Sequence, residues 1–215
     1  MPQSTFYESH RKEAVEAMKK RMFLIMTVLL LTILSGCKKA NKVLVTDDIE
    51  MDTMLVKADG TAQSGTIEEF GEAYYDLSEL DAFVTKEIEK YNQSVNEEAI
   101  AKVSLELKKE NAVLILNYSS LEHYNAFNEG KSSLYSTADA LEIKNLPDSF
   151  ISEKKGETVS KETALKDGKH KVLLVEADTD VIVEGNIIYY NNAVLLDKHT
   201  IQAGSKGTSI VIFKP

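Results

Sequence analysis

The sequence predicts an α+β fold in which a mainly antiparallel sheet carries one long and one short helix on one face. Three observations support this prediction. Apolar residues recur at helical spacing over residues 77–91, apolar and polar residues alternate over 103–108, and short β-rich segments follow one another from residue 171 onward. Connections of two or three residues separate several of those last segments, and they predict antiparallel neighbours because parallel strands need a long crossover.

The domain is expected to span residues 53–215, with two small subdomains as the alternative to a single unit. Its first element is a predicted hairpin, in which residues 54–57 and 62–67 flank the dipeptide Asp59-Gly60. Asp-Gly is a favoured hairpin dipeptide because both residues tolerate the positive φ angles of a tight turn.

A capping box marks the start of the long helix. Asp76 is expected to accept hydrogen bonds from amides of the first turn, and Glu79 is expected to reach back to the cap. Six apolar residues then recur at spacings of three and four, which predicts an amphipathic helix lying on a core: Leu77, Leu80, Phe83, Val84, Ile88 and Tyr91.

The middle of the chain predicts the sheet on which this helix lies. Residues 103–108 alternate, with Val103, Leu105 and Leu107 on the expected core face, and 112–118 predict a more buried strand. A second capping motif, Ser119-Ser120-Leu121-Glu122, opens the short helix, which Gly130 ends. Another short strand is expected at 132–135. Periodicity is lost after residue 143, and we expect a flexible loop near 152–169.

The last third of the chain is predicted to be entirely β. Clusters of Asp, Asn and Gly separate its apolar segments, as is typical of turns. The predicted strands are 171–176, 181–184, 187–190, 193–196 and 209–213.

Ahead of the domain, residues 22–34 are apolar apart from two threonines, and Lys19, Lys20 and Arg21 come directly before them. This layout is typical of a signal peptide, so we expect residues 1–36 to be removed. The apolar run is too short to remain as a span, since a membrane helix needs about 20 apolar residues. Met18 is a more natural start than Met1, and residues 1–17 are interpreted as a gene-model extension; an unusually long n-region is the alternative.

The apolar run ends in Leu34, and Leu34-Ser35-Gly36-Cys37 resembles the lipobox of bacterial lipoproteins. The resemblance implies cleavage between Gly36 and Cys37 and a diacylglycerol thioether on Cys37. The alternative is a buried, unreactive cysteine at the end of an apolar helix. Two or more acyl chains anchor a protein firmly where one binds only marginally. We therefore expect attachment to the lipid bilayer through acylated Cys37, incorporation of palmitate, and a location on the extracytoplasmic face of the cell membrane.

Residues 37–52 are expected to form a polar tether between the lipid and the domain. Lys38, Lys39 and Lys42 either lie near anionic headgroups or belong to a solvated linker. In leader, lipobox, tether and domain, the chain resembles small uncharacterised surface lipoproteins of Gram-positive bacteria. That resemblance implies no particular activity, and the sequence leaves the envelope type open.

Composition limits the partners of the expected mature chain. Residues 37–215 contain 20 basic residues, all of them lysine, and 31 acidic residues, for a net charge of −11. An acidic domain without arginine is a poor ligand for a phosphate backbone, so we expect no nucleic-acid partner. Cys37 is the only cysteine, which excludes a disulfide within the chain and a cysteine-based metal site.

No cofactor or metal is expected. The acidic stretch 47–52 lacks the glycine and the ligand spacing of an EF-hand loop, and Lys206 precedes Gly207 where a phosphate loop needs the reverse order. No Ser, His and Asp set is nominated as a triad by spacing alone. Three histidines also lack the spacing of a zinc site: His123, His170 and His199.

Tyrosine is mildly enriched, with eight in residues 37–215 and no tryptophan. Adjacent residues of an extended chain face opposite ways, so each of two tyrosine pairs places at least one ring outward. Tyrosine combines an apolar ring with a polar hydroxyl, which suits protein and glycan surfaces. We therefore predict a candidate binding face around Tyr74, Tyr75, Tyr189 and Tyr190.

The sequence as a whole predicts a binding or interaction module tethered in the cell envelope, with a protein, peptide or glycan as ligand, rather than an enzyme. One alternative is an envelope hydrolase that uses Asp178 and Asp180 as a carboxylate pair, although carboxylates beside a tight turn usually serve the turn. A second alternative is a solute-binding accessory of a transporter, which a mature chain of 179 residues makes less favourable because two lobes must close on the solute.

Overall fold

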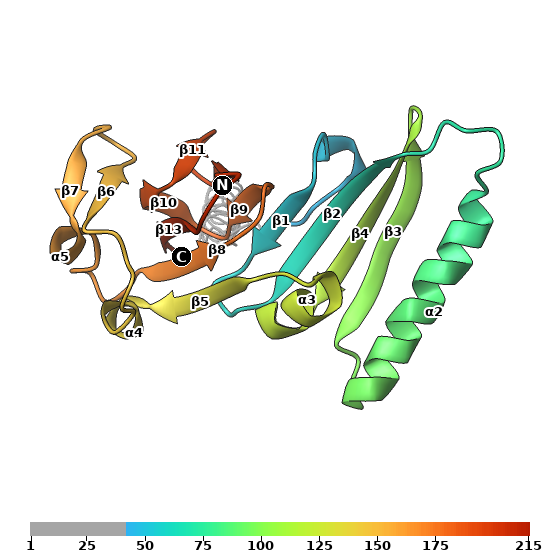
Figure 1. Ribbon diagram of the computed structural model, residues 1–215, viewed down its shortest axis with the longest axis horizontal. Coiled ribbons are helices and arrows are strands. Elements are labelled where there is room, and N and C mark those ends of the chain that lie inside the picture. The colour runs from blue at the N-terminus through green and yellow to red at the C-terminus, as the bar shows by residue number, and fades with distance from the viewer. Residues whose placement is uncertain (1–41) are drawn as a thin grey trace, which may run out of the picture. The chain divides into compact units, whose positions relative to one another are not determined.

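The computed structural model describes residues 42–215, which form one compact unit. The predicted signal peptide, the predicted cleavage site between Gly36 and Cys37 and the predicted lipidation site at Cys37 lie outside these residues. Two β-sheets and four α-helices make up residues 42–215, and most of the regular structure is strand (Figure 1). The α+β class is therefore confirmed, whereas the predicted single sheet is wrong because the strands divide between two sheets.

The seven-stranded sheet is mixed. Only β1 and β9 pair in parallel; the other five pairs in its strand order are antiparallel. Its strands, in spatial order, are β11 (Ala193–Leu195), β12 (Thr200–Ala203), β9 (Asp180–Val183), β1 (Thr53–Val56), β2 (Ala62–Glu69), β4 (Asn111–Tyr118) and β3 (Ile100–Lys108).

The six-stranded sheet is antiparallel throughout. Its strands, in spatial order, are β5 (Ser132–Ser136), β8 (Lys171–Val175), β13 (Ser209–Lys214), β10 (Asn186–Asn191), β6 (Ser149–Ser152) and β7 (Thr158–Ser160).

The two predicted helices exist and begin at the predicted caps. Asp76 accepts hydrogen bonds from the amides of Ser78 and Glu79 at the start of α2 (Leu77–Val95), and Ser120 accepts one from His123 at the start of α3 (Leu121–Asn128). Residues 42–215 also contain two short helices that were not predicted, α4 (Thr137–Leu141) and α5 (Lys161–Ala164), and a 3₁₀ turn, η1 (Thr46–Asp48).

The predicted first hairpin is confirmed. Strands β1 and β2 pair antiparallel, with Val56 opposite Ala62. In the turn between them, Gly60 has a φ of +90°, and the Asp59 carboxylate accepts hydrogen bonds from both the amide and the hydroxyl of Thr61. A glycine with a positive φ angle and an Asp side chain that accepts hydrogen bonds from the residue two positions later are both typical of tight turns.

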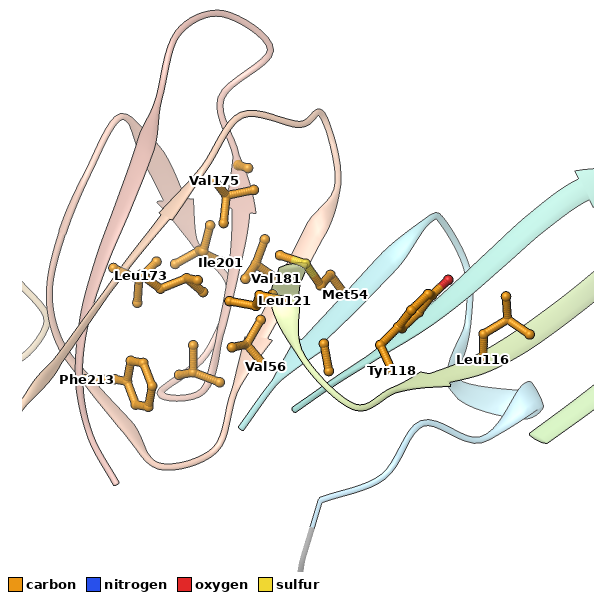
Figure 2. Packing of buried hydrophobic residues seen from close by; sticks show 14 of the residues in the cluster. Met54, Val56, Leu116, Tyr118, Leu121, Leu173, Val175, Val181, Ile201 and Phe213 are labelled. Carbon is orange, nitrogen blue, oxygen red and sulfur yellow. The ribbon is translucent and has the colours of Figure 1, made fainter. Parts of the chain in front are cut away.

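The main core lies between the two sheets. Side chains of β1, β9 and β12 from the seven-stranded sheet meet side chains of β8, β10 and β13 from the other. Figure 2 shows this core continuing from Phe213 past Val56 and Met54 to Tyr118 and Leu116. On the other side of β1, the core-facing side of the seven-stranded sheet is covered by α2 and α3 instead of by the second sheet. Ile88 of α2 and Leu121 of α3 are buried there.

Alternation along β13 explains why the six-stranded sheet is buried on both faces. Val211 and Phe213 belong to the core between the sheets, whereas Ile210 and Ile212 belong to a second core with residues of α4 and α5. Strand side chains alternate between faces, so the four successive apolar residues 210–213 of β13 require a covering layer on each side. A third, smaller core buries Leu44 and Ile49 against the outer face of the seven-stranded sheet.

The C-terminal strands differ from the prediction in how they pair. Strands β8, β9, β10 and β11 follow one another through short connections, but successive members belong to opposite sheets. The expectation that these neighbours pair antiparallel is therefore wrong. Strand β12 was not predicted; its Thr200 and Ile201 are buried, and it pairs with β9 and β11.

Three further details correct the prediction. The segment expected to be a loop near 152–169 contains β7 and α5. A β-bulge between Lys102 and Ser104 shifts the register of β3, and Val103 is 49% exposed and Leu107 54% exposed instead of facing the core. On α2 only Ile88 is fully buried, and Phe83 is 62% exposed, because the helix covers the end of the sheet beside the edge strand β3.

Candidate functional site

Three aromatic rings cluster in the loop between β2 and α2. The ring of Phe70 stacks on that of Tyr75 with centroids 4.8 Å apart, and Tyr74 meets Tyr75 edge to face, also at 4.8 Å. Tyr74 is 76% exposed and Tyr75 is 45% exposed. We call Phe70, Tyr74 and Tyr75 the aromatic cluster. Exposed rings that are packed on one another present a large apolar surface to solvent, as binding surfaces do.

Backbone hydrogen bonds hold the loop that carries the aromatic cluster. The amide of Phe70 donates to the carbonyl of Glu110, in the β3–β4 turn, at 2.6 Å, and the amide of Tyr75 donates to the carbonyl of Glu72 at 3.0 Å. Asp76 then caps α2. The loop connecting β2 to α2, at the upper right of Figure 1, is thus held at its start by the β3–β4 turn and at its end by the first turn of α2. These bonds reduce the conformational entropy that the loop loses when a ligand binds.

The surroundings of the aromatic cluster are acidic. Residues 68–79, which include the end of β2, the loop and the start of α2, contain five carboxylates and neither lysine nor arginine. The side-chain hydrogen bond with Tyr74 raises the pKa of Tyr75, and the nearby charges of Glu72 and Glu69 raise it further. Negative charge close to a phenol disfavours the phenolate, so Tyr75 stays a neutral hydroxyl.

The other two predicted binding tyrosines lie elsewhere. Tyr189 and Tyr190 are in β10 of the six-stranded sheet, and both are half-buried. Tyr190 packs against the core between the sheets and Tyr189 against the second core, as alternation along a strand requires. Tyr74 and Tyr75 therefore come together in one cluster, whereas Tyr189 and Tyr190 face opposite sides of their strand.

Asp178 and Asp180, the carboxylates of the hydrolase alternative, are in different surroundings. Asp178 is exposed in the β8–β9 connection, whereas Asp180 opens β9 and is half-buried. Burial raises the pKa of Asp180, and its Oδ1 has no hydrogen-bond partner within residues 42–215. Between them, the hydroxyl of Thr179 donates to the carbonyl of Asp52 at 2.5 Å, which ties this connection to the start of β1.

The side chain of His123, in α3, contacts Tyr91 of α2 and Glu97, which follows that helix. Its Nδ1 lies 2.9 Å from the hydroxyl of Tyr91, and its Nε2 lies 2.6 Å from a carboxylate oxygen of Glu97. In the neutral tautomer with the proton on Nε2, the imidazole donates to Glu97 and accepts from Tyr91, so both ring nitrogens are satisfied. Sequence reasoning missed this set because Tyr91 and His123 are 32 residues apart, and no spacing rule relates the ends of two separate helices.

The other two histidines also have local partners. Nε2 of His170 lies 3.5 Å from the carboxylate of Asp167, and Nδ1 of His199 contacts the carbonyl of Gly185. Within residues 42–215, no group of three His, Cys, Asp or Glu side chains is arranged to hold a metal ion. None of the helices in that range is long and apolar enough to cross a membrane.

Two hollows lie beside α3. An apolar groove of about 460 Å³ separates α2 from α3, and its walls include Phe83, Val84, Tyr91, Leu114 and Phe127. A more polar hollow of about 510 Å³ lies between the β1–β2 turn, the start of α3 and the edge strand β5, and it is lined by Asp59, Glu122, Tyr135 and Lys171 among others. Neither hollow contains the aromatic cluster.

No protein-family model, curated protein or solved structure matches this chain.

Proposed function

We propose that this protein is a lipid-anchored binding module of the bacterial cell envelope, held on the extracytoplasmic face of the membrane by acylated Cys37. The single observation that carries the proposal is the order of elements in the sequence: three basic residues, an apolar run at 22–34, and the sequence Leu34-Ser35-Gly36-Cys37 at the end of that run. Acylation at Cys37 leaves the domain facing the medium outside the membrane.

The binding role draws support from the exposed aromatic cluster. Tyr74 and Tyr75 are predicted binding residues, and their rings pack with Phe70 in a loop held by backbone hydrogen bonds. Rigid, exposed aromatic residues recur in binding surfaces because they contribute large contact areas at low entropic cost. We propose the aromatic cluster as the binding surface of the module.

Metabolic labelling tests the anchor. In a bacterial host fed radiolabelled palmitate, the full chain is expected to incorporate label and to sediment with membranes, and Cys37→Ser is expected to lose both properties. Ser35→Ala is the matched control, because a small residue replaces a small residue beside the same cysteine. Equal labelling and equal sedimentation of the wild type and Cys37→Ser would contradict the proposal.

Affinity capture tests the binding role. A tagged full chain is incubated with detergent-solubilised envelope, beside the variant Tyr74→Ala/Tyr75→Ala. Both side chains are exposed, so the variant is expected to fold. An envelope component retained by the wild type and lost by the variant is the expected result. Identical retention by the two proteins would show that the aromatic cluster is not the binding surface.

A further inference from the structure

We propose that the aromatic cluster binds a basic peptide segment of a partner protein, with lysine or arginine side chains lying over the exposed tyrosine rings. This inference rests on the proposed binding function and specifies its ligand. Three features support a basic peptide as ligand: the exposed ring surfaces and the charge of the surrounding chain favour a cation, and the extent of the cluster favours a peptide.

The exposed rings attract cations. The face of an aromatic ring carries partial negative charge, so an ammonium or guanidinium group placed over it is held electrostatically. Tyr74 is the most exposed ring of the cluster, and its edge-to-face contact with Tyr75 has an interplanar angle of 62°. The two rings therefore present differently oriented surfaces to one incoming chain.

The charge around the rings favours a basic partner over an acidic or neutral one. Glu69 and Glu72 lie close enough to Tyr75 to influence its ionisation. The β3–β4 turn, which holds Phe70, adds Glu110 and one opposing charge, Lys109. Lys108, next in the chain, is already engaged by Glu50 at 2.8 Å and by the carbonyls of Asp47 and Ile49. Carboxylates thus outnumber free cations around the cluster.

The extent of the cluster favours a peptide over a single small cation. Successive ring centroids from Phe70 through Tyr75 to Tyr74 are each 4.8 Å apart. An extended peptide advances about 3.3 Å per residue and its side chains alternate between faces, so residues i and i+2 of one segment lie on the same face and can contact different rings. The fixed backbone of the loop lets such a segment bind without prior rearrangement.

The test titrates the full chain in detergent with fluorescein-labelled deca-lysine, followed by fluorescence anisotropy, with labelled deca-glutamate as the negative probe. Tyr74→Ala/Tyr75→Ala leaves the net charge unchanged and is expected to weaken deca-lysine binding about tenfold. Tyr74→Phe/Tyr75→Phe keeps the rings and is expected to retain affinity within about threefold. Circular dichroism confirms that the variants remain folded.

A second pair of variants separates local charge from overall charge. Glu69→Gln/Glu72→Gln is expected to weaken binding and to reduce its dependence on salt. Glu89→Gln/Glu142→Gln removes two exposed carboxylates elsewhere and is expected to bind like the wild type. Equal weakening by the two glutamine pairs, or unchanged binding by Tyr74→Ala/Tyr75→Ala, would show that deca-lysine responds only to net charge and would overturn the inference.

An oligosaccharide arm distinguishes the other class of ligand. Labelled chitohexaose that binds the wild type and not Tyr74→Ala/Tyr75→Ala, while deca-lysine fails to bind, would overturn the inference in favour of a glycan surface. The same titrations on Cys37→Ser keep this result separate from the anchor: we expect its affinity for deca-lysine to equal that of the wild type. Failure of peptide binding would leave the palmitate result unaffected.

Discussion

Residues 53–118, which also contain α2, and residues 171–214 both contain strands joined by short connections, yet the two regions build structure in different ways. In the first region β1 and β2 form one hairpin and β3 and β4 another, all within the seven-stranded sheet. In the second region the chain passes from one sheet to the other between β8 and β9, β9 and β10, and β10 and β11. A short connection therefore does not by itself imply that its two strands pair.

Burial explains the difference. The first region has polar residues on much of one face, as β3 and the end of β2 show. In the second region β13 is buried from Ser209 through Phe213, and β8 is buried at Val172, Leu173 and Val175. Strands that are apolar on both faces need a layer on each side, and passing between two sheets supplies those layers.

The largest expected effect comes from the core between the sheets. Phe213→Ala removes a fully buried ring from β13, and we expect it to lower the free energy of unfolding by about 3–5 kcal/mol. Phe83→Ala removes the same ring from the exposed side of α2 and is expected to change stability by about 0.5 kcal/mol or less. Urea unfolding followed by circular dichroism measures both. Similar losses in the two variants would show that α2 contributes as much to stability as the core between the sheets.

Two glycines allow the connection between the two sheets to be compared with the hairpin turn: Gly185 lies between β9 and β10, and Gly60 lies in the β1–β2 turn. Gly185, between β9 and β10, has a φ of +131°, and a Cβ there would collide with the backbone of Lys214 and Pro215. Gly185→Ala is therefore expected to cost on the order of 3 kcal/mol. Gly60, in the β1–β2 turn, has a φ of +90° but open space around it, so Gly60→Ala is expected to cost about 1–2 kcal/mol of backbone strain alone. Thermal unfolding of the two variants tests this order, and a larger loss for Gly60→Ala would contradict it.

The smallest expected effect is on the pH dependence of stability, to which Asp59 and Asp180 contribute with opposite signs. Hydrogen bonds from the amide and hydroxyl of Thr61 lower the pKa of Asp59, so its contribution to stability is present at neutral pH and is lost as pH falls through that pKa. Burial raises the pKa of Asp180, so its contribution is present at low pH and is lost as pH rises through that pKa. At pH 7 we expect Asp59→Asn to be less stable than the wild type and Asp180→Asn to be more stable.

Both differences are expected to shrink on acidification, first for Asp180, whose pKa is raised, and only at lower pH for Asp59, whose pKa is lowered, because a protonated carboxyl is neutral like its amide replacement. Urea midpoints at pH 7 and at pH 3 measure the change. Asp178→Asn is the control, since that side chain is exposed in the same connection as Asp180. Shifts of the same sign for Asp59→Asn and Asp180→Asn would contradict the opposite environments of the two carboxyls.

The candidate site was predicted in part. The paired tyrosines Tyr74-Tyr75 are visible in the sequence, but Phe70 joins them only through the folding of the loop that the Glu110 carbonyl holds. Tyr189-Tyr190 is the same dipeptide and lies in a strand covered by cores on both faces. Two identical dipeptides therefore differ in accessibility because of the layers around them.

The sequence by itself determined the local structure: the α+β class, the first hairpin, and the helix starts at Asp76 and Ser120. These features depend on residues a few positions apart, whose turn and cap hydrogen bonds form wherever the segment lies. Only the tertiary structure decided the division into two sheets, the parallel pairing of β1 with β9, and the union of Tyr91, Glu97 and His123. Those features join segments distant in the chain, and burial of both faces of the strands, which no local spacing encodes, is the physical reason that they form.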